Sequence, residues 1–289
     1  MYSNYFIIND DFLDGFEDIE KVKLSEYAYS IYCKCCKRGT KRLAIAKYLS
    51  SPHTRYPVVY FYCPKCKKSY FLPCFGKKAA ENMKYCANCR EPSIDHRFNE
   101  GIHKVADLLK ISDKLEDSEG VQSKELNQCI ITMLCSIYEV YLRDFYADIL
   151  NSKFVRQKYS LYKKFLKDCK NDFLNPGKTA DRFKKELGID YRNIIGEDVY
   201  KALILLADSR NVIVHNNGIC DTAFVSHHPD IEIRSQIMPS TKMVLEFFKL
   251  VILTVKQLDE IYQKEIRSIV ILNMTEQIKV SGLPTQAKS

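Results

Sequence analysis

The sequence predicts an α+β protein of more than one domain, in which a small cysteine-rich β module precedes an all-α helical bundle. Eight of the twelve cysteines lie between residues 33 and 89. From Cys33 to Arg90 the chain holds 14 Lys or Arg and one acid, a charge of +13, whereas the whole chain is +8, so the remainder sums to −5. Beyond residue 122 the apolar side chains recur at helical spacing. A basic block of this kind is typical of proteins that bind an anionic partner.

Length and composition indicate an ordinary globular chain. Its 289 residues are enough for two domains, and 46% apolar with 28% charged residues is a globular composition. The N-terminus is acidic and has no basic region of the kind that opens a signal peptide. The longest apolar stretch, 243–253, is interrupted by Glu246 and Lys249, which excludes a membrane span. We therefore expect a cytoplasmic protein with no membrane partner.

The chain divides into five expected segments. They are an acidic N-terminal segment (1–30), a basic cysteine-rich domain (31–97), a polar linker (98–122), a helical domain (123–270) and a C-terminal tail (271–289). In the second segment, YPVVYFYCPKC is rich in β-branched and aromatic residues, which predicts a strand that ends in a proline-bearing turn. The run ISDKLEDSEGVQS is polar and charged, and it indicates the linker.

Helices are expected over most of the remaining chain. The segment SKELNQCIITMLCSIYEVYLRDFYADIL keeps its apolar residues at helical spacing for about seven turns. A basic, aromatic helix is expected over 153–170, and a short helix should end at Gly188. Another helix, over 197–215, should stop at an Asn-Asn-Gly turn. DIEIRSQI alternates like a short strand, and a long helix is expected over 243–266.

The clustered cysteines form three Cys-x-x-Cys pairs, a spacing in which one tight turn directs two thiolates at the same ion. The pairs are Cys33/Cys36, Cys63/Cys66 and Cys86/Cys89. The second and third pairs are separated by 19 residues, which is typical of zinc ribbons. We predict that these two pairs hold one structural Zn²⁺, so that residues 31–97 form a zinc-ribbon-like domain. The ligands would be Cys63, Cys66, Cys86 and Cys89.

Two alternatives for the cysteines stay open. Cys33 and Cys36 either replace one of the other pairs or form a second site with Cys74 and with His53 or His96. A disulfide framework would use the same residues, but nothing in the sequence indicates secretion.

Three lysines beside the second pair, Lys65, Lys67 and Lys68, are predicted to contact RNA. Lysine side chains give sequence-independent affinity for phosphate groups. Aromatic residues between the pairs either stack on unpaired bases or form the small core of the domain. The alternative for the lysines is that they only make the domain soluble.

The stretch SRNVIVHNNG, residues 209–218, combines an obligate cation with a residue that titrates near neutrality. Arg210 stays charged and binds phosphate through two N–H groups, whereas His215 is suited to proton transfer. Together they suffice for transesterification of RNA without a metal, because one moves a proton and the other stabilises the phosphorane. The alternative is structural, with Arg210 paired to a core acid and His215 capping a helix C-terminus.

Helical geometry constrains this pair. Positions 210 and 215 lie about 140° apart around an ideal helix, whereas Asn211 and His215 share a face. We expect Asn211 to orient the imidazole. Convergence of Arg210 and His215 then requires either an unwound helix end or a second copy of the chain.

RNVIVHNNG resembles the Arg-Asn-x3-His signature of HEPN-domain ribonucleases (higher eukaryote and prokaryote nucleotide-binding), in particular of the RiboL-PSP and abortive-infection-like members. The segment LNQCIITMLCSIYEVYLRDFYADIL is similar to the first long helix of a bacterial HEPN subgroup, in which a Glu precedes an aromatic-Leu-Arg-Asp run. Here that Glu is Glu139, and the run is 141–144. The likeness covers about residues 122–266, half of the chain, and the cysteine module lies outside it.

The resemblance implies a HEPN-like helical bundle that dimerises and brings both motifs to a shared cleft. It also implies metal-independent endoribonuclease activity, often in toxins and phage defence. Arg210 and His215 would be catalytic, Asn211 would support the histidine, and Glu139 would be a polar member of the cleft. An i,i+4 salt bridge from Glu139 to Arg143 is the alternative for that glutamate.

The sequence by itself leaves three candidate functions. The first is an endoribonuclease homodimer whose zinc ribbon recognises RNA, with an antitoxin or another regulatory partner. The second is a non-catalytic, zinc-dependent RNA- or protein-binding adaptor that dimerises through its helices. A DNA-binding regulator is the third, and it is disfavoured because no helix is both basic and free of core-facing apolar positions.

Overall fold

The computed structural model describes residues 31–33, 38–40, 44–45, 58–67, 69–73, 89–116, 120–154 and 160–280. This part of the chain is mostly helical, and the expected helical bundle is confirmed. Among the described helices, none combines the length and the apolar content that crossing a membrane requires.

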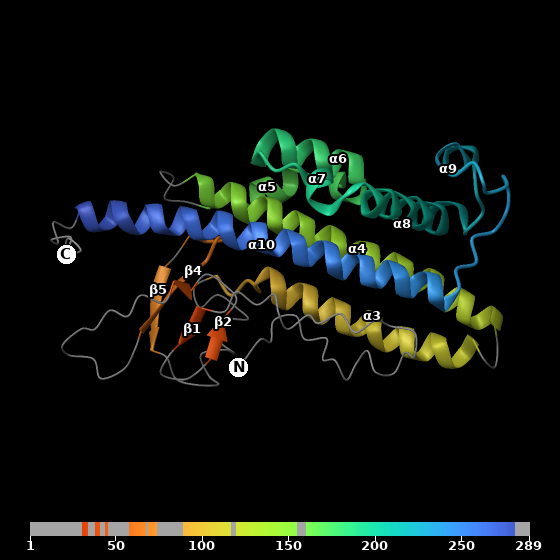
Figure 1. Cartoon of the computed structure of the whole chain (residues 1–289), viewed down its shortest axis with the longest axis horizontal. Helices are drawn as coiled ribbons and strands as arrows, with labels where there is room; N and C mark the ends of the chain where they lie inside the picture. The colour runs from red at the N-terminus through yellow and green to blue at the C-terminus, as the bar shows by residue number, and fades with distance from the viewer. Residues whose placement is uncertain are drawn as a thin grey trace.

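Three long helices lie side by side and form the body of the bundle (Figure 1). They are α3 (Ile94–Glu116), α4 (Gly120–Lys153) and α10 (Thr241–Val280). α4 is central, because it contacts α3, α10 and the shorter helices. A Cβ on Gly101 of α3 would lie 2.8 Å from Cγ1 of Ile137 on α4, so this glycine permits the close approach of the two helices.

Shorter helices cover the side of α4 that faces away from α3 (Figure 1). They are α5 (Tyr162–Asp168), a 3₁₀ turn (Asp172–Leu174), α6 (Pro176–Arg182), a π-helical turn (Phe183–Leu187), α7 (Tyr191–Ile195), α8 (Glu197–Asn216) and α9 (Thr222–His227). Side-chain caps begin several of them: Asn175 accepts a hydrogen bond from the backbone N–H of Lys178, and Asp221 accepts one from Phe224. Such caps satisfy N–H groups that have no partner within the helix.

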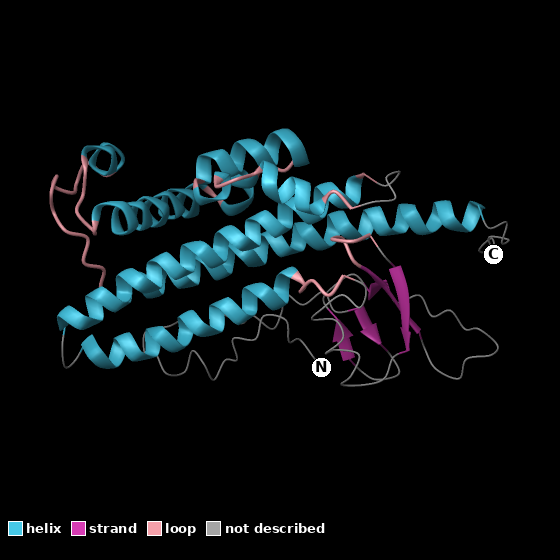
Figure 2. Ribbon diagram, turned by 180° about the vertical axis from the view of Figure 1, so that it is seen from behind, coloured by secondary structure: helices cyan, strands magenta, loops and turns pink. Residues whose placement is uncertain are grey.

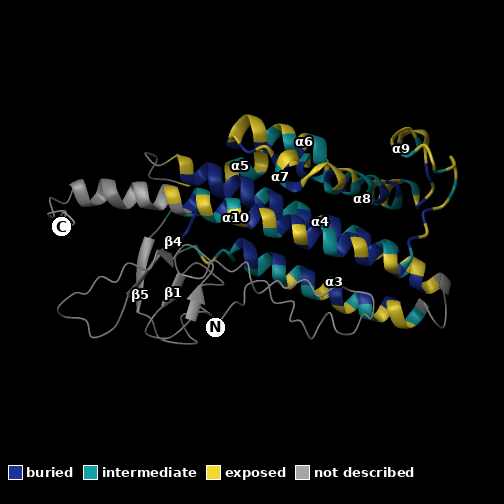
Figure 3. Cartoon of the chain, viewed as in Figure 1, coloured by how far each residue is buried: buried dark blue, intermediate teal, exposed yellow. Residues whose placement is uncertain are grey.

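The core lies where the long helices turn their apolar faces toward one another, seen as dark blue faces in Figure 3. Aromatic rings fill its centre: Phe145 of α4 stacks on Phe183 with ring centroids 5.1 Å apart, and Tyr262 of α10 lies 5.6 Å away. The buried hydroxyls of Tyr138 and Tyr191 pair with each other at 2.7 Å, so neither is left unsatisfied. The small helices are therefore fastened to α4 by packing and by hydrogen bonds.

The described strands belong to two small antiparallel sheets, which lie at one end of the long helices (Figure 2). β1 (Ile31–Cys33) pairs with β2 (Arg38–Thr40), and β4 (Val58–Tyr62) lies between β3 (Ala44–Ile45) and β5 (Ser69–Pro73). In the second sheet Tyr60 is opposite Phe71. β4 is the strand expected in YPVVYFY, and it leads directly into Cys63.

The expected polar linker over 98–122 is wrong. Helix α3 occupies most of it, and α4 already begins at Gly120. The reason is an amphipathic pattern, because Phe98, Ile102, Val105 and Leu109 are all at most 2% exposed and lie on one face. Charged residues on the opposite face made the segment resemble a connector.

Three other expectations need correction. The helix expected over 153–170 is broken, since α4 ends at Lys153 and α5 begins at Tyr162. DIEIRSQI is not a regular strand, and only an isolated bridge between Ile219 and Gln236 forms there. The last helix continues to Val280, so it takes in part of the expected C-terminal tail. α8, by contrast, ends one residue from its expected end.

Candidate metal centre and candidate active site

Three cysteines from two of the Cys-x-x-Cys pairs come together. The sulfurs of Cys63, Cys66 and Cys89 lie within 4.8 Å of one another, and this group could hold a metal ion. Cys63 Sγ and Cys89 Sγ are 3.9 Å apart. Four thiolates at about 2.3 Å from a tetrahedral ion would be about 3.8 Å apart, whereas a disulfide requires about 2.05 Å. The spacing between these two sulfurs therefore fits ligands around one ion.

The same backbone feature follows both of these pairs. Lys67, directly after Cys66, has φ 58°, and Arg90, directly after Cys89, has φ 59°. The N–H of Lys67 donates to the carbonyl of Cys63 at 2.8 Å, which closes the turn. Left-handed φ costs a side-chain-bearing residue roughly 1 kcal/mol or more. Two such turns that present their sulfurs to one point indicate a shared ligand.

Other predicted ligands lie outside the described residues. Cys86 and Cys36 are among them, and for Cys33 the structure describes only the backbone of β1. The fourth ligand of the group thus stays a prediction.

Lys65, which was predicted to contact RNA, is instead part of the protein interior. Its side chain is 4% exposed, and its Nζ lies 3.0 Å from Asp144 Oδ2 on α4. Nζ also donates to the hydroxyl of Tyr162 at 2.8 Å, and Arg97 donates to both oxygens of Asp144. A lysine held in this way cannot reach a phosphate group, so this prediction is wrong. The sequence placed Lys65 in a turn, but it gave no sign that the buried carboxylate of Asp144 would pair with this lysine.

Further hydrogen bonds attach the Cys63–Lys67 turn to the end of α4. Asn151 Nδ2 donates to the carbonyls of Pro64 and Lys65 at 2.6 and 3.0 Å, and Ser160 donates to the carbonyl of Lys65. Lys67 Nζ donates to the carbonyl of Phe154 at 2.7 Å, and partial burial lowers the pKa of Lys67. The Cys63–Lys67 turn is thus built into the helical bundle. Lys68 lies outside the described residues.

The Arg-x4-His motif occupies the last two turns of α8. The helix stays regular through Asn216 and then ends with Asn217 and Gly218 in the left-handed region, at φ 52° and 79°. The carbonyl of Val212 accepts hydrogen bonds from the N–H groups of Asn217 and, at 3.0 Å, of Gly218, and these bonds close the end of the helix. Because the helix does not unwind, one of the two routes for bringing Arg210 and His215 together is excluded.

Asn211 does not orient the histidine, contrary to expectation. Arg210 Nη1 donates to Asn211 Oδ1 at 3.2 Å, and both Asn211 and His215 are exposed. This contact joins the guanidinium to a side chain that shares a helix face with His215. In the described part of the chain, Arg210 Nε is buried and has no hydrogen-bond partner.

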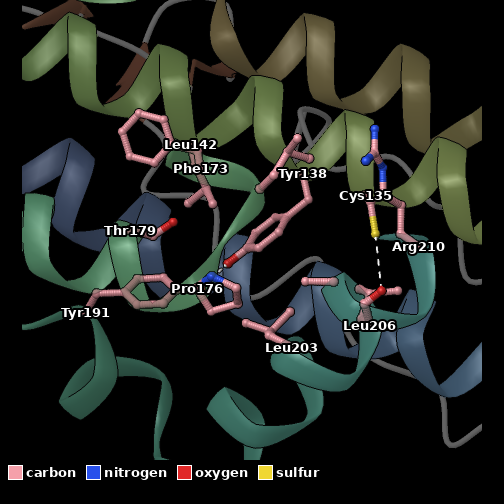
Figure 4. A pocket seen from close by; sticks show the side chains of 12 residues that line it. Cys135, Tyr138, Leu142, Phe173, Pro176, Thr179, Tyr191, Leu203, Leu206 and Arg210 are labelled. Carbon is pink, nitrogen blue, oxygen red and sulfur yellow. Dashed lines mark hydrogen bonds between the residues drawn. The ribbon is translucent and has the colours of Figure 1, made fainter. Parts of the chain in front are cut away.

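Arg210 lies beside Cys135 at one end of an apolar pocket, with Thr179 and Tyr191 at the other end (Figure 4). Cys135 Sγ donates to the Leu206 carbonyl at 3.7 Å, and burial raises the pKa of this thiol to about 12. The pocket has a volume of about 20 Å³, room for about one water molecule. It is therefore too small for a nucleotide, and a ligand of Arg210 would have to bind from the outer surface.

Glu139 lies on α4 near Arg210. Burial raises the pKa of its carboxyl, and the charges of Arg143 and Arg210 oppose this rise. Arg143 Nη1 is 3.9 Å from Glu139 Oε1, so the i,i+4 pair that was the alternative is present at the long limit of a salt bridge. Glu139 therefore forms a long salt bridge with Arg143, and it also lies close enough to Arg210 for the two charges to interact.

A second polar cluster on α8 was missed by the sequence analysis. Asp208 Oδ2 accepts from His227 Nδ1 at 2.9 Å and from His228 Nε2 at 3.0 Å. The two histidines end α9, which folds back along α8. The only signal in the sequence was the pair of adjacent histidines, which carries no information about a partner 19 residues away.

The comparisons with known proteins assign no relative. No family model matches the chain, and neither a curated protein nor a solved structure does.

Proposed function

We propose that the chain is a metal-independent endoribonuclease of the HEPN type, which cleaves RNA by attack of the substrate's own 2′-hydroxyl. Arg210 carries this proposal. Its Nη1 donates to Asn211, which shares the exposed face of α8 with His215, so the outer end of the guanidinium lies at the surface. A cation with unused donors at a solvent-facing edge is suited to a phosphate group.

The chemistry divides between the two side chains. Arg210 stays protonated, so it stabilises charge that develops on the phosphorane and does not transfer a proton. His215 transfers a proton near neutral pH. The resemblance to toxin and phage-defence ribonucleases favours a role in such a system, with an antitoxin or other regulatory partner.

The proposed active form is a homodimer. Apolar side chains that are 38–51% exposed surround the end of α8 that bears His215. They are Val214, Ile219, Ile233 and Met238. A second copy seated on this surface would bury them and bring two motifs together.

We further propose that the cysteine group holds one structural Zn²⁺, with Cys86 as fourth ligand. Sulfur ligands at tetrahedral spacing fit Zn²⁺, and the ion would fix the turn that places Lys65 on Asp144. RNA contacts are then assigned to Lys67 and Lys68 and not to Lys65.

The test uses purified protein and a mixed RNA pool in the presence of a chelator at low dose. The expected products are a 5′ fragment with a 2′,3′-cyclic phosphate and a 3′ fragment with a 5′-hydroxyl. A 2′-deoxy nucleotide at the cut site should block cleavage, because it removes the nucleophile. Cleavage of DNA at an equal rate, or no cleavage of any RNA by folded dimer, would contradict the proposal.

One observation favours the second candidate, a non-catalytic adaptor. Asn211 binds Arg210, so the contact expected between Asn211 and His215 does not form, and no described residue orients the imidazole in its place. In that case the bundle would only dimerise and bind RNA, and His215→Ala would leave every measured property unchanged.

A further inference from the structure

One face of α8 carries three polar side chains at helical spacing. Asp208, Asn211 and His215 stand at i, i+3 and i+7, and residues seven apart differ by about 20° around the axis. Arg210 reaches this face through its hydrogen bond to Asn211. At 1.5 Å per residue, Asn211 lies about 4.5 Å along the axis from Asp208 and about 6 Å from His215. A phosphate on Arg210 would therefore have Asp208 on one side and His215 on the other.

Asp208 holds two imidazoles on a single oxygen. A carboxylate only accepts hydrogen bonds, so His227 donates from Nδ1 and His228 donates from Nε2. In neutral His227 this arrangement leaves Nε2 as the acceptor, and the side chain is 62% exposed. His228 is 16% exposed and packs against Phe224 in a tilted arrangement with ring centroids 4.6 Å apart. His227 thus presents a basic nitrogen to solvent, whereas His228 supports the cluster.

The position of α9 is determined by packing and not by the histidines alone. Phe224 of α9 and Val212 of α8 belong to one buried cluster with Cys220 and Ile237. Asp221 caps α9 and accepts a further hydrogen bond from Asn216 Nδ2 at 2.7 Å. Because Val212 is one turn from Asp208, this packing holds the end of α9 against the carboxylate.

The proposed cleavage moves two protons, one from the 2′-hydroxyl and one to the 5′-oxygen that leaves. Arg210 transfers neither, and His215 carries out one of the transfers. The other transfer needs a second acid–base group within reach of the same phosphate, either the second His215 of the proposed homodimer or another side chain beside this face of α8.

We propose that His227 is the general base of this reaction and that Asp208 is its positioning residue; the inference rests on the proposed ribonuclease function. His227 Nε2 takes the proton of the 2′-hydroxyl, and the 2′-oxygen attacks phosphorus. As the phosphorus–O5′ bond breaks, His215 gives a proton to O5′. The products are a 2′,3′-cyclic phosphate and a 5′-hydroxyl, and proton exchange with water restores both imidazoles.

The Asp208 carboxylate decides the assignment of roles. In a His–Asp pair the carboxylate holds the ring in one tautomer and stabilises the imidazolium that forms when the ring accepts a proton. His227 has that partner. The remaining transfer, to O5′, then falls to His215 in the last turn of α8.

The experiment compares His227→Gln, His215→Gln and a control, His103→Gln on α3, with two dinucleotide substrates. One substrate has the natural 5′-oxygen leaving group, and the other has a 5′-thio leaving group, which departs without protonation. With the oxygen substrate, His227→Gln and His215→Gln should each lose about 10²–10⁴-fold in rate, and the control should not. With the thio substrate, His215→Gln should regain most of its rate and His227→Gln should stay slow.

Variants of Asp208 distinguish a loss of positioning from a loss of the fold. Asp208→Asn should lower kcat with little change in KM, and Asp208→Glu should restore part of the rate, which a merely structural role would not produce. Recovery of His227→Gln on the thio substrate, or a normal rate of that variant on the oxygen substrate, overturns the proposal. Those outcomes leave the ribonuclease function intact, whereas an inactive wild-type protein removes the function itself.

Discussion

The Cys63–Lys67 turn and the polar face of α8 each place a cation beside an acid-bearing helix, yet they are built in opposite ways. Lys65 is 4% exposed, and its ammonium contacts Asp144 and Tyr162. Arg210 has a buried Nε without a partner in the described chain and an Nη1 at the surface. A charge enclosed by partners within the protein stabilises the fold, and a charge whose outer end reaches the surface can bind a ligand.

This difference corrects an interpretation based on composition. The basic block from 33 to 90 led to the prediction that Lys65, Lys67 and Lys68 contact RNA. One of them faces an anion within the protein, because a lysine stem fits among apolar side chains while its ammonium pairs with a buried carboxylate. The position of a charge in the fold therefore decides its role more than the charge of its neighbours in sequence.

The largest effect is expected from loss of a metal ligand. Cys63→Ser should abolish zinc binding and unfold the turn, since structural zinc contributes on the order of 10 kcal/mol in small zinc domains. Metal analysis of protein purified without chelator measures this directly. Cys129→Ser on the exposed surface of α4 is the matched control and should keep about one zinc per chain. Full zinc content in Cys63→Ser would show that the group is not the metal site.

Replacement of Arg210 should lower the rate of RNA cleavage and leave the stability of the fold unchanged. Arg210→Ala should reduce the RNA cleavage rate by about 10³-fold or more, because one preorganised donor to the transition state is worth roughly 3–4 kcal/mol. Single-turnover cleavage measures this rate, and thermal unfolding checks the fold. Arg192→Ala, which removes an exposed partner of Glu197, should cleave normally. Equal rates for the two variants would favour the adaptor function.

Replacement of Lys65, the buried cation, should lower the stability of the fold and leave RNA binding unchanged. Lys65→Met should destabilise the protein by roughly 3 kcal/mol, because Asp144 keeps Arg97 but loses its closest ammonium. Denaturant unfolding measures the change, with the exposed Lys104→Met on α3 as control. RNA affinity should be unchanged wherever the variant is folded. A clear loss of RNA affinity without a loss of stability would restore Lys65 as a contact residue.

A smaller effect is expected from the other two lysines that were predicted to contact RNA. Lys67→Glu combined with Lys68→Glu should weaken RNA binding about tenfold at low salt. It should also lower the slope of log affinity against log salt by about 1 for each phosphate group that the protein no longer neutralises. Titration at several salt concentrations gives both quantities. An unchanged slope would mean that these lysines serve solubility.

The smallest effect concerns pH and Glu139. Burial raises the pKa of this carboxyl above its ordinary 4.5, so the folded state binds the proton more tightly than the unfolded state. Stability should therefore fall as pH rises from about 4.5 through the raised pKa. Glu139→Gln should remove that dependence and be more stable at pH 7 by under about 1 kcal/mol, since the group is only half-buried. Unfolding at several pH values tests this, and a loss of stability at pH 7 would show that pairing with Arg143 dominates.

Local signals in the sequence were sufficient for several elements. The Asn-Asn-Gly turn marks the end of α8, because asparagine and glycine adopt the left-handed φ that ends a helix. The Cys-x-x-Cys spacing predicted a shared site, and Cys63, Cys66 and Cys89 do come together. Apolar periodicity predicted α4 almost completely. In each case the physical cause acts over a few neighbouring residues.

The tertiary structure alone decided what depends on contacts between distant residues. α3 resembles a linker until α4 covers its apolar face. Lys65 meets Asp144 across 79 residues, and Asp208 meets His227 across 19. No local pattern encodes such pairs, because burial and the return path of the chain determine which carboxylate a cation or an imidazole will reach.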